Sequence, residues 1–175
     1  MSSNSESNRE YAPTDFQDQL DILRQIPFFS QLPLETNKVL AYLCTREVFK
    51  KGSVLFNQGD TDGQAIYILS GNARVEHEDN GHTLPIRDVG TGSFIGGLSL
   101  MAEISWLFSL TATEDLVCLV ITREKFQRAL EQFPDVMPAI IKGLAVNIRN
   151  WEERLLADHT RVCEQCIGKA GVSLL

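Results

Sequence analysis

The sequence predicts an α+β fold, in which a jelly-roll or barrel of antiparallel strands is flanked by N-terminal and C-terminal helices. Three observations support this class. Apolar residues recur at helical spacing near both ends of the chain, the middle alternates with period two, and turn signals built from Gly, Asn and Asp separate its segments. Because the strands are grouped rather than interleaved with helices, an antiparallel arrangement is favoured over a parallel sheet.

The composition limits the classes of partner. The chain has 175 residues, of which 43% are hydrophobic and 22% charged, as expected for one globular domain with a core. A formal net charge of −7 argues against nucleic acid or an anionic membrane as the main partner. No apolar run reaches the ~18 residues of a membrane span, and the polar N-terminus lacks a signal-peptide pattern. With only four cysteines, we expect a cytoplasmic protein.

The chain divides into one domain and two tails. Residues at the N-terminus are rich in Ser, Asn and Glu and cannot bury enough surface to become ordered. Thr14 and Gln17 form a capping-box pattern that starts the first helix, and Pro27 and Pro33 separate this helix from a second one. The predicted units are a disordered tail over 1–13, a domain over 14–157 and a C-terminal tail over 158–175.

The middle of the chain reads as a series of short strands. Alternating or continuously apolar segments are bounded by glycine, and Asn80-Gly81 is a strong signal for a tight hairpin. Thr122 is placed to cap the helix that follows the last strand, and Pro134 separates that helix from a longer one over about 135–157. The predicted strands are 47–50, 53–56, 65–69, 73–77, 83–89 and 116–121.

The last helix carries an apolar seam. Its apolar positions are spaced by three, four, three and four residues, as in a short coiled coil, while the neighbouring charges lie off the seam. We therefore predict a homodimer through this helix; the alternative is that the helix packs on its own barrel. The seam residues are Ile141, Leu144, Ile148, Trp151 and Leu155.

The stretch 90–112 is the candidate functional segment. Gly96 and Gly97 lead from a strand into a short apolar helix, and the first N–H groups of a helix have no partner within it. Free N–H groups and the helix dipole together favour an anion such as phosphate. The alternative is a tight strand-to-helix turn that binds nothing.

The order of several segments resembles the cyclic nucleotide-binding domain family of catabolite-activator-type regulators and protein kinase A regulatory subunits. The resemblance covers roughly Leu20 to Ala157. It implies a non-enzymatic regulatory module with cAMP or cGMP as ligand, a last helix that lies over the pocket as a lid, and a downstream signalling protein. The segments are LRQIPFFSQL, FKKGSVLFNQGD, AIYILSGNARV, GTGSFIGGLSL and LVCLVITREKF.

The phosphate-binding cassette departs from the family pattern. In the family, a Glu binds the ribose 2′-hydroxyl and a later Arg pairs with the cyclic phosphate; here those positions hold Gly97 and Trp106. Losing both groups should cost at least ~3 kcal/mol of binding free energy. The resemblance thus implies weakened or lost cAMP and cGMP binding, or a non-standard nucleotide or apolar ligand in the same pocket. The predicted ligand-binding residues are Gly96, Gly97, Leu98, Ser99, Trp106, Leu107, Phe108 and Ser109, with the N–H groups of 97–99 expected to remain free.

The sequence favours three other functional classes less: a metal or redox protein, an enzyme and a DNA-binding protein. His159, Cys163 and Cys166 could hold a metal or form a redox pair, although a second Cys pair is missing. No Ser/His/Asp or Cys/His arrangement, carboxylate pair or phosphate loop with Lys indicates an enzyme. DNA binding is not expected, because the stretch 158–175 is too short for a winged helix-turn-helix.

Overall fold

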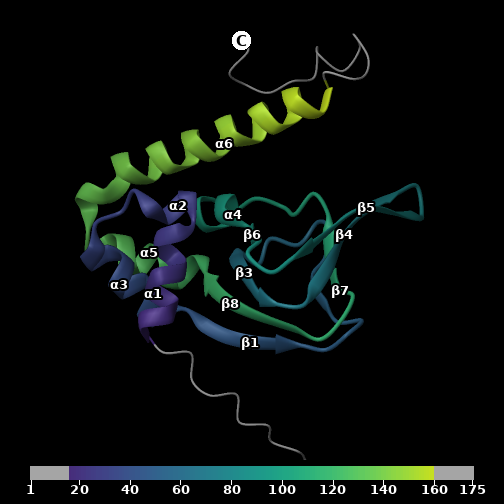
Figure 1. Ribbon diagram of the computed structural model, residues 1–175, viewed down its shortest axis with the longest axis horizontal. Coiled ribbons are helices and arrows are strands. Elements are labelled where there is room, and N and C mark those ends of the chain that lie inside the picture. Colours follow the sequence, from purple (N-terminus) through teal and green to yellow (C-terminus); the bar gives the residue numbers. More distant parts are fainter. Residues whose placement is uncertain (1–15, 160–175) are drawn as a thin grey trace, which may run out of the picture.

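The structure is a computed structural model that describes residues 16–159, without the side chains of 151 and 154–159. Three helices come first, and two helices and a 3-10 turn come last (Figure 1). Between them the strands form two four-stranded sheets, ordered β1-β8-β3-β6 and β2-β7-β4-β5, and every recorded strand pair is antiparallel. The predicted α+β jelly-roll class is confirmed, as two paired sheets rather than a closed barrel.

The predicted elements follow the chain in the predicted order, and a short helix that begins at Pro27 is added where the sequence predicted only a break between two helices. The helices are α1 (Phe16–Gln25), α2 (Pro27–Ser30), α3 (Leu34–Leu43), α4 (Gly97–Met101), α5 (Arg123–Glu131) and α6 (Met137–His159), with a 3-10 turn at Pro134–Val136. The strands are β1 (Thr45–Phe49), β2 (Val54–Phe56), β3 (Gln64–Ser70), β4 (Asn72–Asp79), β5 (His82–Gly90), β6 (Phe94–Ile95), β7 (Ser109–Ala112) and β8 (Leu116–Thr122).

Local sequence signals explain the element boundaries. Asn80 and Gly81 adopt positive φ angles of 51° and 79° in the β4–β5 turn, a conformation that Asn and Gly tolerate best. The hydroxyl of Thr122 accepts a hydrogen bond from the Lys125 N–H at 3.4 Å, which caps α5 as predicted. Pro134 stands at the start of the 3-10 turn, so α6 begins at Met137. The predicted capping residue Thr14 lies outside the described residues.

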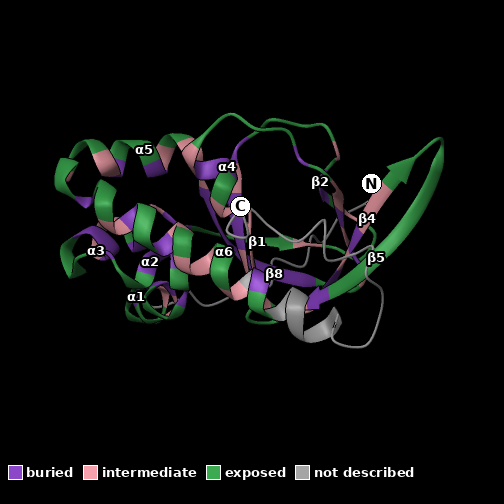
Figure 2. Ribbon diagram, turned by 90° about the horizontal axis from the view of Figure 1, so that it is seen from above, coloured by how far each residue is buried: buried purple, intermediate pink, exposed green. Residues whose placement is uncertain are grey.

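Two apolar clusters form the core. One lies among the helices and centres on Phe28, Phe29 and Phe126, which are fully buried. The other lies between the sheets, where β8 is buried along nearly its whole length while β5 is mostly exposed (Figure 2). The β4–β5 hairpin extends away from this core (Figure 1). Within the described residues, no helix is long and apolar enough to span a membrane.

The last helix packs on the N-terminal helices rather than on the sheets. Val136, just before α6, and Ile140 within it are buried in the helical cluster, and α6 makes its main contacts with α2. Gly143 allows the close approach, because a Cβ atom there would lie 2.8 Å from the carbonyl oxygen of Phe28. α6 therefore lies along one side of the molecule above α2 (Figure 1).

Candidate functional site

The short helix α4 begins at a glycine that no other residue could replace without strain. Gly96 has a φ of 92° and forms the N-cap of α4. A Cβ atom there would overlap the carbonyl oxygen of Gln64 and lie 2.7 Å from Cη2 of Trp106. The fold thus brings together Gly96 and Trp106, two predicted site residues from separate parts of the cassette.

The backbone part of the predicted anion site is smaller than expected. The N–H of Ser99 donates a hydrogen bond to the carbonyl oxygen of Gly96 at 3.0 Å, and the Ser99 residue is buried. The expectation that this N–H would remain free for a phosphate was wrong, because the first turn of α4 closes on its own cap. The side chain of Leu98 is exposed to solvent.

Arg123 donates hydrogen bonds to α4 and to the loop before β3, a role that the sequence did not predict. Its Nε donates to the carbonyl oxygen of Ser99 at 2.7 Å, and its Nη2 donates to that of Thr61 at 3.2 Å. Gly63 makes room, since a Cβ atom there would overlap the guanidinium group. The only signal in the sequence was an arginine directly after the last strand. Its charge is directed to two carbonyl oxygens of the protein itself.

Trp106 occupies the position at which the resemblance places an arginine. Its indole stacks on the ring of Phe56 with centroids 3.7 Å apart and an interplanar angle of 13°. The Nε1–H donates to Oδ1 of Asp62 at 2.7 Å, and the residue is only 6% exposed. Two backbone hydrogen bonds, to Asp60 and from Gly59, fix the main chain of Trp106 in place. Phe56 thus contacts the face of the indole and Asp62 accepts a hydrogen bond from its edge, while the main chain of Trp106 is held separately.

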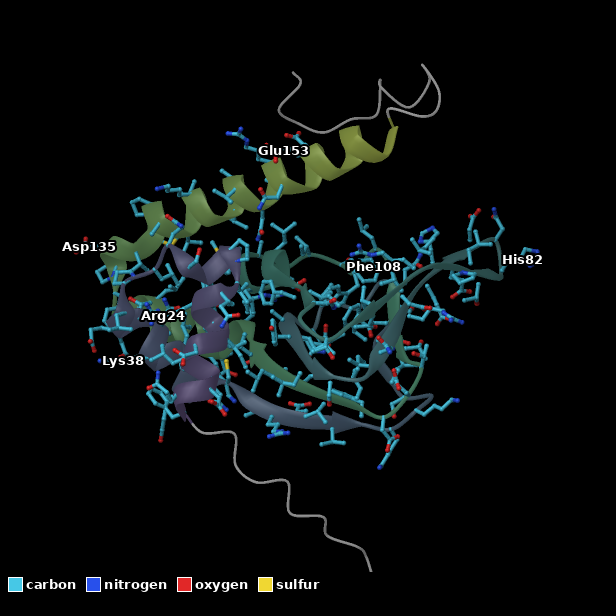
Figure 3. All side chains as sticks on the ribbon, in the orientation of Figure 1. Arg24, Lys38, His82, Phe108, Asp135 and Glu153 are labelled. Carbon is cyan, nitrogen blue, oxygen red and sulfur yellow. The ribbon has the colours of Figure 1, made fainter. Side chains whose placement is uncertain are left out.

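The three residues after Trp106 separate into buried and exposed positions. Phe108 is half-buried and packs against Phe56 and Trp106, and Ser109 accepts a hydrogen bond from the Gln58 N–H at 2.9 Å. Leu107 is 77% exposed. Because Ser109 pairs with Glu76, Phe108 lies beside β4 of the β4–β5 hairpin (Figure 3). Of these three predicted ligand-binding residues, only Leu107 has a mainly solvent-exposed side chain.

One of the two histidines of the β4–β5 hairpin contacts the cassette. Nδ1 of His77 donates a hydrogen bond to the carbonyl oxygen of Leu107 at 3.0 Å, so this nitrogen carries the proton. His82 lies at the far tip of the hairpin (Figure 3). His77 thus ties β4 to the cassette loop through a contact that the sequence did not predict.

Phe28 connects the cassette to the last helix. A Cβ atom on Gly97 would lie 3.0 Å from Cε1 of Phe94 and 3.4 Å from Cδ2 of Phe28. The carbonyl group of the same Phe28 is in close contact with Gly143 of α6. The Phe28 ring is fully buried, with centroid distances of 4.8 Å to Phe29 and 5.9 Å to Phe94. A change in volume at the cassette glycine would therefore be felt at the α2–α6 contact.

The metal and redox hypothesis has no support in the described residues. No group of three His, Cys, Asp or Glu within the described part of the chain could hold a metal ion. Cys163 and Cys166 lie outside that part, as does the side chain of His159. The tail site remains a prediction from the sequence.

The two described cysteines should be chemically inert. Burial raises the pKa of both the Cys44 and the Cys118 thiol to about 12. Since the thiolate is the reactive form, we expect neither to be alkylated by iodoacetamide at pH 8 in the native protein and both to be alkylated in urea. Peptide mass spectrometry measures this. Rapid native labelling of either cysteine would contradict the burial described here.

Comparison with known proteins places this site in a family. The protein-family model named cyclic nucleotide-binding domain matches residues 46–133 of this chain. The cyclic AMP receptor protein of Thermus thermophilus is 31% identical over 126 residues, which cover 70% of this chain and 57% of that protein. The cGMP-dependent protein kinase 2 of Homo sapiens is 25% identical over 138 residues, which cover 77% of this chain but 18% of the kinase.

A solved structure supports the same assignment. The cyclic nucleotide-binding-like protein from Brucella abortus is 30% identical, with a TM-score of 0.60, over 65% of this chain and 98% of that one. This chain spans less than two thirds of the two longer relatives, the receptor and the kinase. The family model and the shared architecture agree with the segments that carried the resemblance in the sequence. The chain belongs to the cyclic nucleotide-binding domain family.

Proposed function

We propose that this chain is a non-enzymatic regulatory module in which Trp106 fills the cyclic nucleotide site from within. The observation that carries the proposal is the indole of Trp106, stacked on Phe56 and hydrogen-bonded to Asp62. Its single donor is already used by the protein, so it is not available to a phosphate oxygen. The arginine behind the cassette, Arg123, is likewise engaged with carbonyl oxygens.

The free-energy cost of nucleotide binding follows from these contacts. The missing Glu–ribose and Arg–phosphate bonds remove at least ~3 kcal/mol. Displacing the indole would also break an aromatic pair of about 0.5–1.5 kcal/mol and a hydrogen bond to a carboxylate of about 1.5–3 kcal/mol. Together these terms weaken affinity by a factor of at least ~10³. A non-standard nucleotide in the same pocket would have to displace the same ring.

Calorimetric titration tests the proposal. We expect no binding heat when cAMP, cGMP or cyclic di-GMP is added to the wild-type protein at up to millimolar concentration. A Gly97→Glu, Trp106→Arg double variant should gain cAMP or cGMP binding, because it restores both charged contacts. Leu107→Arg is the matched control, since it adds the same charge at the next, exposed position and leaves the indole in place; it should gain nothing. Wild-type affinity in the micromolar range or tighter would overturn the proposal.

The signal is proposed to leave the module through α6 towards a downstream signalling protein. Phe28 lies between Gly97 of the cassette and Gly143 of α6, and Ile140 of α6 is buried in the same cluster. This chain of contacts supports coupling between the cassette and the helix. It differs from the lid arrangement expected from the resemblance, since the main contacts of α6 are with α2.

The same helix is proposed to form a homodimer. Its buried side faces α2, whereas Met137, Ile141 and Ile148 are 39%, 60% and 42% exposed; Leu144 between them is half-buried and also packs against the helical cluster. These positions are spaced by four, three and four residues, as in the seam predicted from the sequence. The side chains of Trp151 and Leu155, which would continue the seam, lie outside the described residues.

Light scattering after size-exclusion chromatography tests the dimer. The wild-type protein should have twice the mass of the chain, and an Ile141→Asp, Ile148→Asp variant should be monomeric with unchanged circular dichroism. Buried apolar seams tolerate charge poorly, whereas exposed positions off the seam do not respond. Lys142→Asp is the control on the neighbouring face and should remain dimeric. A monomeric wild type at micromolar concentration would contradict the seam.

A further inference from the structure

The first turn of α3 contains a buried threonine whose polar groups have no partner. α3 begins at Leu34 with Pro33 as its N-cap, and Pro33 has no side-chain oxygen that could accept from the first N–H groups of the helix. Thr36, the third residue of α3, is 0% exposed, and its Oγ1 has no hydrogen-bond partner among the described residues. Buried polar groups are rarely left unpaired, so this turn is energetically unfavourable as it stands.

Two neighbouring groups add to this cost. The Asn37 N–H donates to the carbonyl oxygen of Pro33 at 3.0 Å, but the N–H of the buried Thr36 makes no such backbone bond in the described part of the chain. Oδ1 of Asn37 is buried and unpaired as well, because the amide is oriented by Nδ2, which donates to the carbonyl oxygens of Phe29 and Leu32, both at 3.2 Å. The unpaired groups thus lie in two successive residues.

The start of α5 shows what a threonine does when it caps a helix. There Thr122 is the N-cap, and its hydroxyl accepts from the N–H of Lys125, three residues later, at 3.4 Å. At the start of α3, the N–H at the same separation from Thr36 belongs to Val39. This N–H lies inside the helix and has its acceptor one turn earlier, so the Thr36 hydroxyl has nothing to cap.

We propose that the first turn of α3 is a two-state element, in which the helix starts either at Leu34, as described, or after Thr36. In the second state the turn over 34–36 is unwound, the Thr36 hydroxyl accepts from the Val39 N–H as an N-cap, and the Thr36 N–H bonds to water. This state loses the hydrogen bonds of one helical turn and gains a cap in place of buried unpaired groups. Because these opposing contributions are of similar size, the two states lie close in free energy.

The surroundings confine the change to this turn. Leu34 is 47% exposed and Glu35 is exposed, so releasing them uncovers little apolar surface. The ion pair between Glu35 and Lys38 would be lost, but it lies at the surface, where such pairs contribute little. From Asn37 onwards the helix is held by the bonds of its amide and by Leu40, which is fully buried in the helical cluster.

The position of this turn connects it to α6. Asn37 becomes the first helical residue of the unwound state, and its amide bonds the carbonyl oxygen of Phe29 in α2. The neighbouring Phe28 carbonyl contacts Gly143 of α6. The helix start is therefore placed to loosen or tighten the α2–α6 contact from a point distinct from the cassette. This consequence rests on the proposed output through α6, whereas the two-state helix start does not.

Nuclear magnetic resonance of the full chain tests the two-state start. In the wild-type protein, relaxation dispersion should show exchange at the amides of 34–39 and, at the same rate, around Gly143. Thr36→Val removes both the unpaired hydroxyl and the cap of the unwound state. This variant should lose the dispersion at both places, and its Asn37 and Lys38 N–H groups should exchange with solvent at least about tenfold more slowly.

Two further variants separate capping from other effects of the substitution. Thr36→Ser keeps the hydroxyl and should retain the dispersion. Thr122→Val is the matched control: it removes a hydroxyl that has a partner, so the Lys125 N–H should exchange faster rather than more slowly. If Thr36→Val leaves the exchange of Asn37 and Lys38 unchanged or accelerates it, the two-state start is overturned. If α3 responds but the amides around Gly143 do not, the link to α6 is wrong and the helix start stands.

Discussion

Replacing Trp106 by alanine is expected to lower the free energy of unfolding by about 3–5 kcal/mol, the usual range for truncating a large buried aromatic residue. The indole is 6% exposed and packs on Phe56 and Phe108 between the two sheets. Its removal leaves a cavity beside the glycine N-cap of α4 and takes away the donor to Oδ1 of Asp62, whose Oδ2 still accepts from Gln64. Urea unfolding followed by far-ultraviolet circular dichroism measures the loss.

Two further variants separate the causes of this loss. Trp106→Phe keeps an aromatic ring on Phe56 but removes the hydrogen bond to Asp62, and it should cost about 1–2 kcal/mol. Leu107→Ala is the neighbouring control: this side chain is 77% exposed, and its loss should stay within about 0.5 kcal/mol. If Trp106→Ala lowered the free energy of unfolding no more than Leu107→Ala does, the claim that the indole packs inside the site would be contradicted.

Gly143→Leu is expected to destabilise the protein by about 1–3 kcal/mol, as overpacking does, and to loosen α6 from α2. A Cβ atom at this position would lie 2.8 Å from the carbonyl oxygen of Phe28, which is backbone and cannot rotate away. The expected effect opposes helix propensity, because glycine is the poorer helix former by about 1 kcal/mol. Hydrogen exchange of the α2 and α6 amides, together with urea unfolding, measures both changes.

Lys142→Leu is the matched control on the same helix. Lys142 is exposed and lies off the proposed seam, so the added side chain enters solvent, and the change in unfolding free energy should stay within about 0.5 kcal/mol. Faster exchange in α2 only for the Gly143 variant would identify the contact with Phe28 as the cause. Equal stability and equal exchange for both variants would mean that α6 is not held through this glycine.

Much of the fold could be predicted because its signals are local. Period-two alternation identified the strands, Asn80-Gly81 identified the β4–β5 turn, and Thr122 identified the start of α5. Each of these depends on a few neighbouring residues and their intrinsic conformational preferences. The sheet order did not follow from such signals, since β8 pairs with β1 and β3 from distant parts of the chain.

The placement of the side chains in and around the cassette could not be predicted in the same way. The sequence identified Trp106 at the arginine position but left open whether its ring fills the pocket or lines it. The answer depends on Phe56 and Asp62, which lie on β2 and in the following loop and reach the indole only through tertiary packing. The role of Arg123 was missed for a similar reason, because it requires the space left by Gly63.

The claim that the Trp106 indole fills the cassette is tested most directly by following the nuclear magnetic resonance signal of its N–H. The chain has two tryptophans, so a Trp151→Phe variant leaves a single indole signal to follow. We predict that this N–H exchanges slowly with solvent, because it donates to Asp62, and that millimolar cAMP or cGMP leaves its chemical shift unchanged. If either nucleotide caused a saturable change in this chemical shift or faster exchange of the N–H, the nucleotide would be displacing the indole. That result would contradict a cassette filled by Trp106.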